Sequence, residues 1–228
     1  ALFGNGGVPL FSIERGAGNE EKAGRILGNS FALLLGSSLL LTILGYLFME
    51  PVLFAFGASE DSFVYAKAYL DIYLIGTVFT MISTGMNGYI NAQGFPRIGM
   101  YTTVLGAVCN IILDPIFIFG LDMGISGAAL ATILAQGASA VLVMRMVHKK
   151  GEAFHIAAKK IKLHTDLLLR IFRIGLPAGI QSVMYALSNL TIQSGVNAFG
   201  TATIASWTVF GKIDSIFWMI IDSFGIAV

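Results

Sequence analysis

Long apolar blocks separated by short polar joints make up almost the whole chain. At the rise of an α-helix, about 20 apolar residues cross the roughly 30 Å hydrocarbon layer of a membrane. Blocks of that length lie at residues 26–49, 64–90, 98–119, 125–147 and 167–199, with a sixth from 201 onward and a helix tail at 1–13. Because the joints are short, consecutive helices are expected to be antiparallel neighbours. The pattern predicts an all-α integral membrane protein, a polytopic helix bundle.

Composition supports the same class. Hydrophobic residues make up 56% of the 228 residues and charged residues only 12%, against about 25% charged residues in an ordinary soluble domain. The expected partner is therefore the lipid bilayer. The net charge is +1, and the basic residues form no cluster beyond what membrane topology explains. The sequence therefore does not indicate a nucleic-acid partner. The single cysteine, Cys109, excludes an internal disulfide.

Basic residues concentrate on one side of the predicted membrane. If the joints alternate sides, twelve of the fourteen lysines and arginines share a side, namely Arg15, Lys22, Arg25, Arg97, Arg145, Lys149, Lys150, Lys159, Lys160, Lys162, Arg170 and Arg173. Lysine and arginine favour cytoplasmic loops. The loops at 14–25, 91–97 and 148–166 are therefore predicted to be cytoplasmic, in a multi-pass protein of the cell inner (plasma) membrane.

The segment 148–166 is the longest polar connection, and it differs in composition from everything around it. We interpret it as a cytoplasmic linker between a first helical lobe at 1–147 and the start of a second lobe at 167–228. A spanning helix normally carries an interfacial anchor at each end, and neither end of the chain shows one. Both ends are therefore expected to be cut inside helices.

Asp114 is the sharpest candidate for chemistry, because a charged residue within a span costs about 2.5 to 3.5 kcal/mol on insertion scales. Asn110 lies four residues earlier, so both side chains share a helix face. Pro115 lacks an amide hydrogen, which is expected to leave the Ile111 carbonyl without its usual partner and to bend the helix. These oxygens suit Na⁺, or the carboxyl group itself carries a proton. The alternative is an aspartate that only caps or solvates the kink.

Two further groups of residues have competing interpretations. Lys67 and Asp71 are four residues apart, which favours a local ion pair at the outer interface. Tyr69 and Tyr73 share a face with Tyr65; they form either an interfacial aromatic belt or part of a cavity for an organic cation.

Near the end of the chain, Lys212, Asp214 and Asp222 lie within an apolar block. Lys212 and Asp214 are two residues apart and do not face each other on a helix. Lining of a polar cavity is one interpretation of this group, and the sequence leaves its role open.

Signatures of catalysis are missing from the sequence. It contains no Gly-x-Ser-x-Gly elbow, no His-Glu-x-x-His and no Asp-Asp-x-x-Asp pair for Mg²⁺ and pyrophosphate. All three histidines, His148, His155 and His164, lie in the polar linker, as expected of solvated residues. We expect neither an enzyme nor a cofactor.

Several stretches together resemble the multidrug and toxic compound extrusion (MATE) family of cation-coupled antiporters. They are Gly4–Asn19, Asn91–Arg97, Asn110–Gly120, Gly124–Thr132 and Gly175–Ala178, and their order and spacing extend across nearly the whole chain. The resemblance favours the DinF-like and MepA-like bacterial or archaeal branch. It implies about half of a twelve-helix, two-lobe transporter, running from within the second helix to within the eighth.

The resemblance also implies a cation site in the first lobe. In this branch, an Asn and an Asp on the fifth helix and a Thr on the sixth hold the coupling ion, and they correspond to Asn110, Asp114 and Thr132. For a sodium-coupled protein, Asp114 and Asn110 are the expected Na⁺ ligands; the family's Asp on the first helix should lie before Ala1. The implied activity is export of amphipathic, often cationic compounds in exchange for Na⁺ or H⁺, by a protein that is monomeric when full length.

Two alternatives to drug export remain open from the sequence. A lipid-linked oligosaccharide flippase of the same superfamily requires a more cationic cavity for pyrophosphate, and few basic residues are embedded here. A membrane channel, from a different class, would conduct without substrate exchange.

Overall fold

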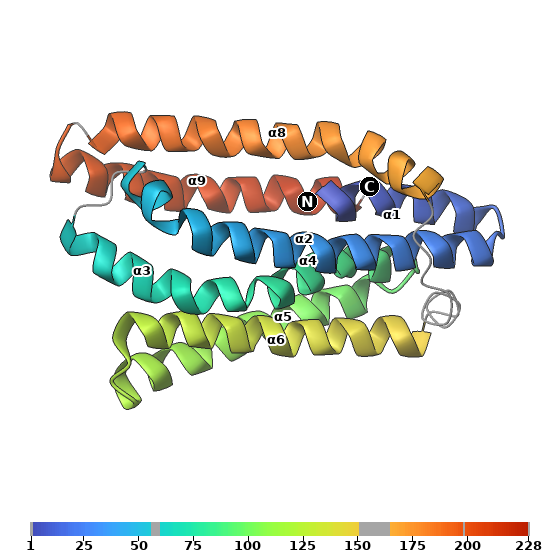
Figure 1. Cartoon of the computed structure of the whole chain (residues 1–228), viewed down its shortest axis with the longest axis horizontal. Coiled ribbons are helices and arrows are strands. Elements are labelled where there is room, and N and C mark those ends of the chain that lie inside the picture. Colours follow the sequence, from blue (N-terminus) through green and yellow to red (C-terminus); the bar gives the residue numbers. More distant parts are fainter. Residues whose placement is uncertain (1, 56–59, 151–164, 198, 228) are drawn as a thin grey trace. The chain divides into compact units, whose positions relative to one another are not determined.

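A computed structural model describes residues 2–55, 60–150, 165–197 and 199–227 of the chain, and every element it describes is a helix (Figure 1). In chain order they are α1 (Leu2–Gly16), α2 (Glu20–Ala55), α3 (Glu60–Ile75), α4 (Thr77–Ala92), α5 (Pro96–Pro115), the π-helical turn η1 (Ile116–Gly120), α6 (Gly124–Lys150), α8 (Thr165–Asn197) and α9 (Thr201–Ala227). They form two compact units, Ala1–Ile180 and Gln181–Val228.

The predicted spans are confirmed in position. Five helical segments of the described chain are long and apolar enough to cross a membrane, and the bent pair of α3 and α4 raises the number to six if it counts as one span. The helix α2 is the longest, with 36 residues, which corresponds to about 54 Å at the α-helical rise. It therefore extends beyond the hydrocarbon layer, and its acidic first turn at Glu20 and Glu21 suits the positive end of a helix dipole.

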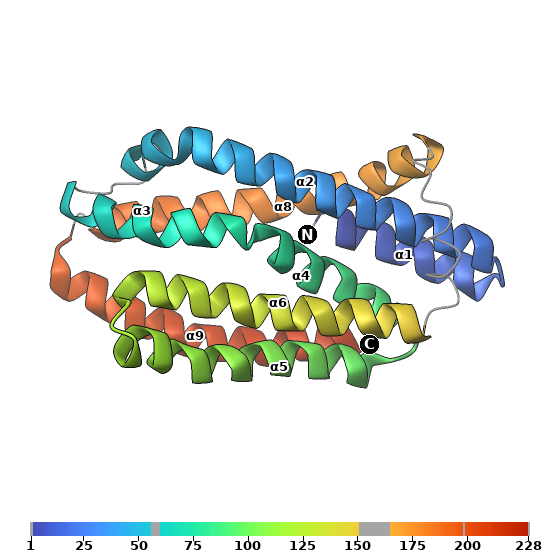
Figure 2. The same cartoon turned by 60° about the horizontal axis from the view of Figure 1, so that its bottom comes forward.

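The predicted span at 64–90 is wrong in one respect, because it is not a continuous helix. Residues Ser62–Ile75 and Thr77–Ala92 meet at Gly76 with a bend of 56°, and Figure 2 shows α4 leaving the direction of α3. A side chain at Gly76 would collide with Ile133 of α6. Glycine both weakens the helix locally and admits this close approach. The bend turns α4 toward α5 and α6, where the polar residues of the site lie.

The joint between α4 and α5 shows why the chain reverses where it does. Gly94 adopts φ 84°, a left-handed conformation that favours glycine. Pro96 is the first residue of α5, where its fixed φ suits a helix start and its missing N–H removes no helical hydrogen bond. The predicted joint at 91–97 is confirmed as a turn that begins within the last residues of α4.

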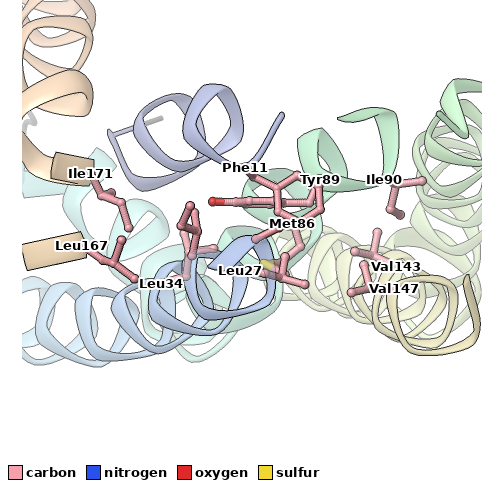
Figure 3. Packing of buried hydrophobic residues seen from close by; sticks show 12 residues of the cluster. Phe11, Leu27, Leu34, Met86, Tyr89, Ile90, Val143, Val147, Leu167 and Ile171 are labelled. Atoms are coloured by element: carbon pink, nitrogen blue, oxygen red, sulfur yellow. The ribbon is translucent and has the colours of Figure 1, made fainter. Parts of the chain in front are cut away.

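The core of the first unit lies where α1, α2, α4, α6 and the start of α8 meet (Figure 3). Its central contact is an edge-on approach of the Phe11 and Tyr89 rings, whose centroids lie 5.4 Å apart. Around it are the buried side chains Ala23, Ile26, Leu27, Leu34, Met86, Ile90, Val143, Val147, Leu167 and Ile171. Because Leu167 and Ile171 belong to this core, the first turns of α8 pack within the first unit. The division into lobes at 148–166 stays a prediction, and residues 151–164 of that linker lie outside the described residues.

Close helix approaches inside this core depend on glycine. The hydroxyl of Tyr89 donates a hydrogen bond of 2.6 Å to Ser30 Oγ on α2, and both residues are fully buried. A side chain at Gly7 of α1 would overlap both oxygens. At Gly6, a side chain would overlap the Ile171 carbonyl oxygen of α8. Small residues therefore let α1 reach α2, α4 and α8 at backbone distance, as membrane helices require for packing without a hydrophobic driving force.

The corner between α1 and α2 is tied by charge. Lys22 Nζ lies 2.5 Å from Glu14 Oε1, and Asn19 Nδ2 donates to Glu14 Oε2 at 3.1 Å. The hydrogen bond from Lys22, followed by that from Asn19, holds the pKa of Glu14 below its ordinary value. Glu14 is thus kept ionised among the basic residues that the sequence assigns to the cytoplasmic side.

We predict that Gly7→Ala destabilises the protein. The added methyl group displaces the Tyr89 ring or breaks its buried hydrogen bond to Ser30, at about 2 kcal/mol. Thermal unfolding of the purified protein in detergent, followed by circular dichroism, measures the loss. Gly36→Ala is the matched control, since Gly36 lies in α2 with open space around its Cα and alanine there should hold or raise stability. Equal melting temperatures for the two variants would contradict this role of Gly7.

Candidate functional site

A polar cavity of about 240 Å³ lies between α4, α5 and α6. We call it the polar cavity; its lining residues are Ser83, Thr84, Asn87, Thr103, Gly106, Ala107, Asn110, Thr132, Ala135, Gln136 and Ser139. Seven of them carry a hydroxyl or amide oxygen, and an eighth, Thr84, carries one on the exposed side of α4. Among these described lining residues none carries a formal charge. The cavity is therefore lined by neutral oxygen atoms, and it lies between three apolar helices.

Hydrogen bonds donated by side chains join the three helices around this cavity. Asn87 Nδ2 of α4 donates to the Gly99 carbonyl at 3.0 Å and to the hydroxyls of Thr102 and Thr103 at 3.0 and 3.1 Å, all on α5. Ser83 donates to Gln136 Oε1 of α6 at 2.6 Å.

The third connection runs between α5 and α6. Ser139 of α6 donates to the Thr102 carbonyl at 2.8 Å. Gly106 of α5 lies close to this bond. A Cβ atom added at Gly106 would contact the Ser139 side chain and the Ala135 carbonyl of α6. In a membrane, such bonds replace the water that polar groups would otherwise need.

Asn110 and Thr132, two of the three residues expected to hold the coupling ion, line this cavity. Asn110 Nδ2 donates to Asp114 Oδ1 at 3.2 Å, so the carboxylate is attached to the cavity through Asn110. The Thr132 hydroxyl donates to the Ala128 carbonyl at 2.9 Å, which leaves its oxygen lone pairs as acceptors. All three side chains are half-buried.

The helix changes geometry immediately after Asp114. α5 ends at Pro115 and continues as the π-helical turn η1. Directly after η1, the Leu121 N–H donates a hydrogen bond of 2.9 Å to the Ile116 carbonyl, five residues earlier. Such π-helical turns are rare and occur frequently at functional sites. The bend predicted at Pro115 stays a prediction, and the observed change at this point is the wider helical turn.

The arrangement suits a hard monovalent cation or a proton. Hydroxyl, amide and carboxylate oxygens are the ligands that hard cations prefer, and one carboxylate balances one positive charge. The described residues contain no cluster of three or more His, Cys, Asp or Glu side chains that would hold a metal ion. The cavity's ligands are instead neutral oxygens beside one acidic group.

Sequence reasoning missed Ser83, Asn87 and Gln136 as parts of this site. Each looks like an ordinary polar residue within an apolar block. The signal that would have found them is spacing: Ser83 and Asn87 are four residues apart on α4, as are Thr132 and Gln136 on α6. Each pair therefore presents two polar groups on one helix face.

The other predicted residues lie elsewhere. Lys67 Nζ lies 2.9 Å from Asp71 Oδ2, so the predicted ion pair is confirmed. The rings of Tyr69 and Tyr73 stack at a centroid distance of 5.6 Å and an interplanar angle of 19°. Their role in a substrate cavity stays a prediction. Asp214 lines a separate hollow in the second unit, and the side chain of Asp222 lies outside the described ones.

Two bacterial multidrug proteins are among the known proteins similar to this chain. The probable multidrug resistance protein YoeA of Bacillus subtilis is 27% identical over 99% of the chain and 50% of its own length. The multidrug export protein MepA of Staphylococcus aureus is 29% identical over 89% of the chain and 49% of its own length. The chain thus spans about half the length of the relatives it matches.

Solved structures and a family model agree with these relatives. A structure described as the inward-facing conformation of a multidrug resistance MATE family transporter of the MOP superfamily matches 94% of the chain and 49% of its own, with a TM-score of 0.85 and 25% identity. A Vibrio cholerae MATE transporter in the bent form matches 93% of the chain and 48% of its own, with a TM-score of 0.77 and 26% identity. The MatE family model matches residues 1–116. The chain is a multi-pass membrane protein, and it belongs to the MatE family of multidrug efflux transporters.

Proposed function

We propose that the full-length protein is a secondary antiporter that exports amphipathic or cationic drugs in exchange for Na⁺ or H⁺. One observation carries the proposal: Asp114, a carboxylate within a span, is hydrogen-bonded to Asn110 at the wall of a cavity of oxygen donors. The relatives' names describe multidrug export and resistance, which supports drugs as the transported compounds.

The position of Asp114 argues against a purely structural role. Ionisable side chains within membrane spans are costly, and they generally face a protein interior or a water-filled cavity. Asp114 is half-buried, and its hydrogen-bond partner Asn110 lines the polar cavity. A carboxylate that only capped the kink would not need a hydrogen-bond partner that lines a polar cavity.

A cavity of neutral oxygens, joined to one carboxylate through Asn110, favours coupling to a monovalent ion. Thr132 and Asn110 offer acceptor oxygens, and Asp114 supplies the compensating charge. The same carboxylate also accepts a proton, so the site serves either ion. Ion binding shifts the equilibrium between two conformations of a transporter only as far as the affinity for the ion differs between them. The π-helical turn η1, directly after Pro115, gives α5 a place where such a rearrangement can be absorbed.

Other activities fit the site less well. A flippase for pyrophosphate-linked oligosaccharides needs cationic side chains, whereas the described residues that line the polar cavity carry no charge. A channel needs no acidic site coupled to a second ligand. We further propose the plasma membrane as the location, with the joints at 14–25, 91–97 and 148–166 on the cytoplasmic side, and a monomer when full length.

Replacing Asp114 tests the proposal directly. In vesicles containing the full-length protein and loaded with ethidium, we expect Na⁺ or proton gradients to drive efflux in the wild type. In Asp114→Asn, efflux should fall about tenfold or more, because the ion loses its charged ligand. Comparing the two gradients identifies the coupling ion.

Asp71→Asn is the control for the loss of a carboxylate. Asp71 is paired with Lys67 on α3, away from the polar cavity, and gradient-driven efflux should persist in this variant. Unchanged efflux in a folded Asp114→Asn protein would move the coupling site elsewhere.

A second test removes one neutral ligand. Thr132→Val keeps the side chain's shape and deletes its hydroxyl, so the apparent affinity for the driving ion should fall about three- to tenfold. Thr191→Val is matched, since the Thr191 hydroxyl also donates to the carbonyl four residues earlier, at the same 2.9 Å. Ion titrations of efflux rate measure both variants. An equal shift in the two would show a general loss of helix packing rather than a ligand role for Thr132.

A further inference from the structure

Gln136 of α6 lines the polar cavity beside the residues of the proposed ion site. Its side chain is half-buried, and Thr132 precedes it by four residues, so the two side chains share one helix face. Gly106 of α5 lines the same cavity and adds no side chain that would fill it. Gln136 thus presents an amide group to the cavity one helical turn away from Thr132.

The amide oxygen of Gln136 is oriented by Ser83 of α4. The buried Ser83 hydroxyl donates a hydrogen bond of 2.6 Å to Gln136 Oε1. An amide oxygen has two lone pairs, so this bond occupies one of them and leaves the second for another partner. The bond also fixes which end of the amide faces Ser83, in the way that surrounding hydrogen bonds orient the ligands of metal sites.

The neutral groups of the proposed ion site use their hydrogen-bond donors within the protein. Asn110 Nδ2 donates to Asp114, and the Thr132 hydroxyl donates to the Ala128 carbonyl. The oxygen lone pairs of Asn110 and Thr132 are therefore the groups that they offer to the cavity. Gln136 Oε1 adds a third neutral oxygen to this set.

Asn87, the amide that α4 contributes to the cavity, has a different role. Its Nδ2 donates to the Gly99 carbonyl and to the hydroxyls of Thr102 and Thr103. Its Oδ1 lies where a side chain at Gly99 would have to be placed. Both ends of the Asn87 amide therefore contact α5 and hold the two helices together, whereas Gln136 keeps a lone pair for a ligand.

The directions of α5 and α6 bring Gln136 and Asp114 toward one level of the cavity. Side chains of an α-helix lean toward its N-terminus, and α5 and α6 run in opposite directions (Figure 2). Asp114 therefore leans toward Asn110, to which it is hydrogen-bonded at 3.2 Å, and Gln136 leans toward Thr132. Because Asn110 and Thr132 line the same cavity, a cation there has the carboxylate at one end and the Gln136 amide at the other.

We propose that Gln136 is a specificity-determining ligand of the coupling ion, whose amide oxygen, positioned by Ser83, supplies a contact that Na⁺ requires and H⁺ does not. The inference rests on the proposed antiport function, and it assigns a further ligand to the same site. A proton binds to a single carboxylate oxygen and needs no second ligand, whereas a hard metal cation is surrounded by several oxygens. Loss of the amide therefore weakens Na⁺ binding and leaves proton binding in place.

Calorimetric titration with Na⁺ tests this role without any gradient. The full-length protein in lipid nanodiscs, with choline as the replacing cation, is titrated over a range of pH. Protons compete with Na⁺ for the carboxylate, so the data give both the Na⁺ dissociation constant at alkaline pH and the pH at which protons displace Na⁺-free sites from binding. Gln136→Met keeps the length of the side chain and deletes the amide, and it should raise the Na⁺ dissociation constant about tenfold with the competition pH unchanged.

A double-mutant cycle separates positioning by Ser83 from general packing. Ser83→Ala should raise the Na⁺ dissociation constant about threefold in the wild-type background and have no further effect in Gln136→Met, because Ser83 acts through Gln136. Ser38→Ala is the matched control. The fully buried Ser38 hydroxyl donates to the carbonyl three residues earlier at 2.8 Å, as Ser83 also does at 3.1 Å, and Na⁺ affinity should persist without Ser38. Where Gln136→Met fails to fold, Gln136→Asn, which withdraws the amide oxygen by one methylene, is measured in its place.

The outcomes separate this inference from the proposed function. Equal Na⁺ affinity in the wild type and a folded Gln136→Met protein overturns the role of Gln136, and so does a wild type that binds no Na⁺; efflux that still depends on Asp114 then leaves the antiporter standing. A shift of both the Na⁺ affinity and the competition pH in Gln136→Met shows a distorted site and also overturns the role. A selective loss of Na⁺ affinity, with Ser83 coupled to Gln136, supports it.

Discussion

The constraint on which this structure depends is the absence of water around the spanning segments. Every buried N–H, C=O and polar side chain must find its partner within the protein, so polar residues in the apolar helices cannot be scattered. In the first unit they gather between α4, α5 and α6, where Ser83, Asn87 and Ser139 bond across helices. The polar cavity is a consequence of this requirement as well as a candidate site, because residues that satisfy each other across helices also enclose space lined with oxygen.

Close packing of backbones makes this gathering possible. Gly76 lets α4 bend toward α6, and Gly7 leaves room for the buried bond between Tyr89 and Ser30. The apolar side chains outside these contacts remain largely exposed, including Leu39, Leu40, Leu41, Ile43 and Leu47 of α2. In water such a surface would cause aggregation, whereas in lipid it is the solvent-facing surface of the protein. Glycine and polar contacts, rather than burial of large apolar groups, therefore decide which helices touch.

The two units place acidic groups in different chemical surroundings. Asp114 accepts a hydrogen bond from Asn110, which lines a cavity of amide and hydroxyl oxygens, and such oxygens suit a small hard cation. Asp214 lines a hollow of the second unit together with tryptophan, phenylalanine and tyrosine residues.

Much of the fold was predictable from the sequence because the membrane fixes the length of a span. About 20 apolar residues are needed for each crossing, and the blocks at 26–49, 98–119 and 125–147 therefore became helices close to the predicted places. The face shared by Asn110 and Asp114, and the ion pair of Lys67 and Asp71, follow from helical spacing within one element. Local periodicity and hydrocarbon thickness determined these features.

Tertiary structure decided what periodicity does not encode, namely which faces meet. The bend at Gly76, the hydrogen bond from Ser83 to Gln136 and the enclosure of Asn110 with Thr132 in one cavity depend on contacts between residues far apart in the chain. The sequence alone also left Lys212 and Asp214 equivalent, and only the structure shows that Asp214, and not Lys212, is among the described residues that line the hollow of the second unit. The physical reason is that neighbouring helices determine the environment of a helix face. The sequence does not distinguish a glycine or an asparagine that faces lipid from one that contacts another helix.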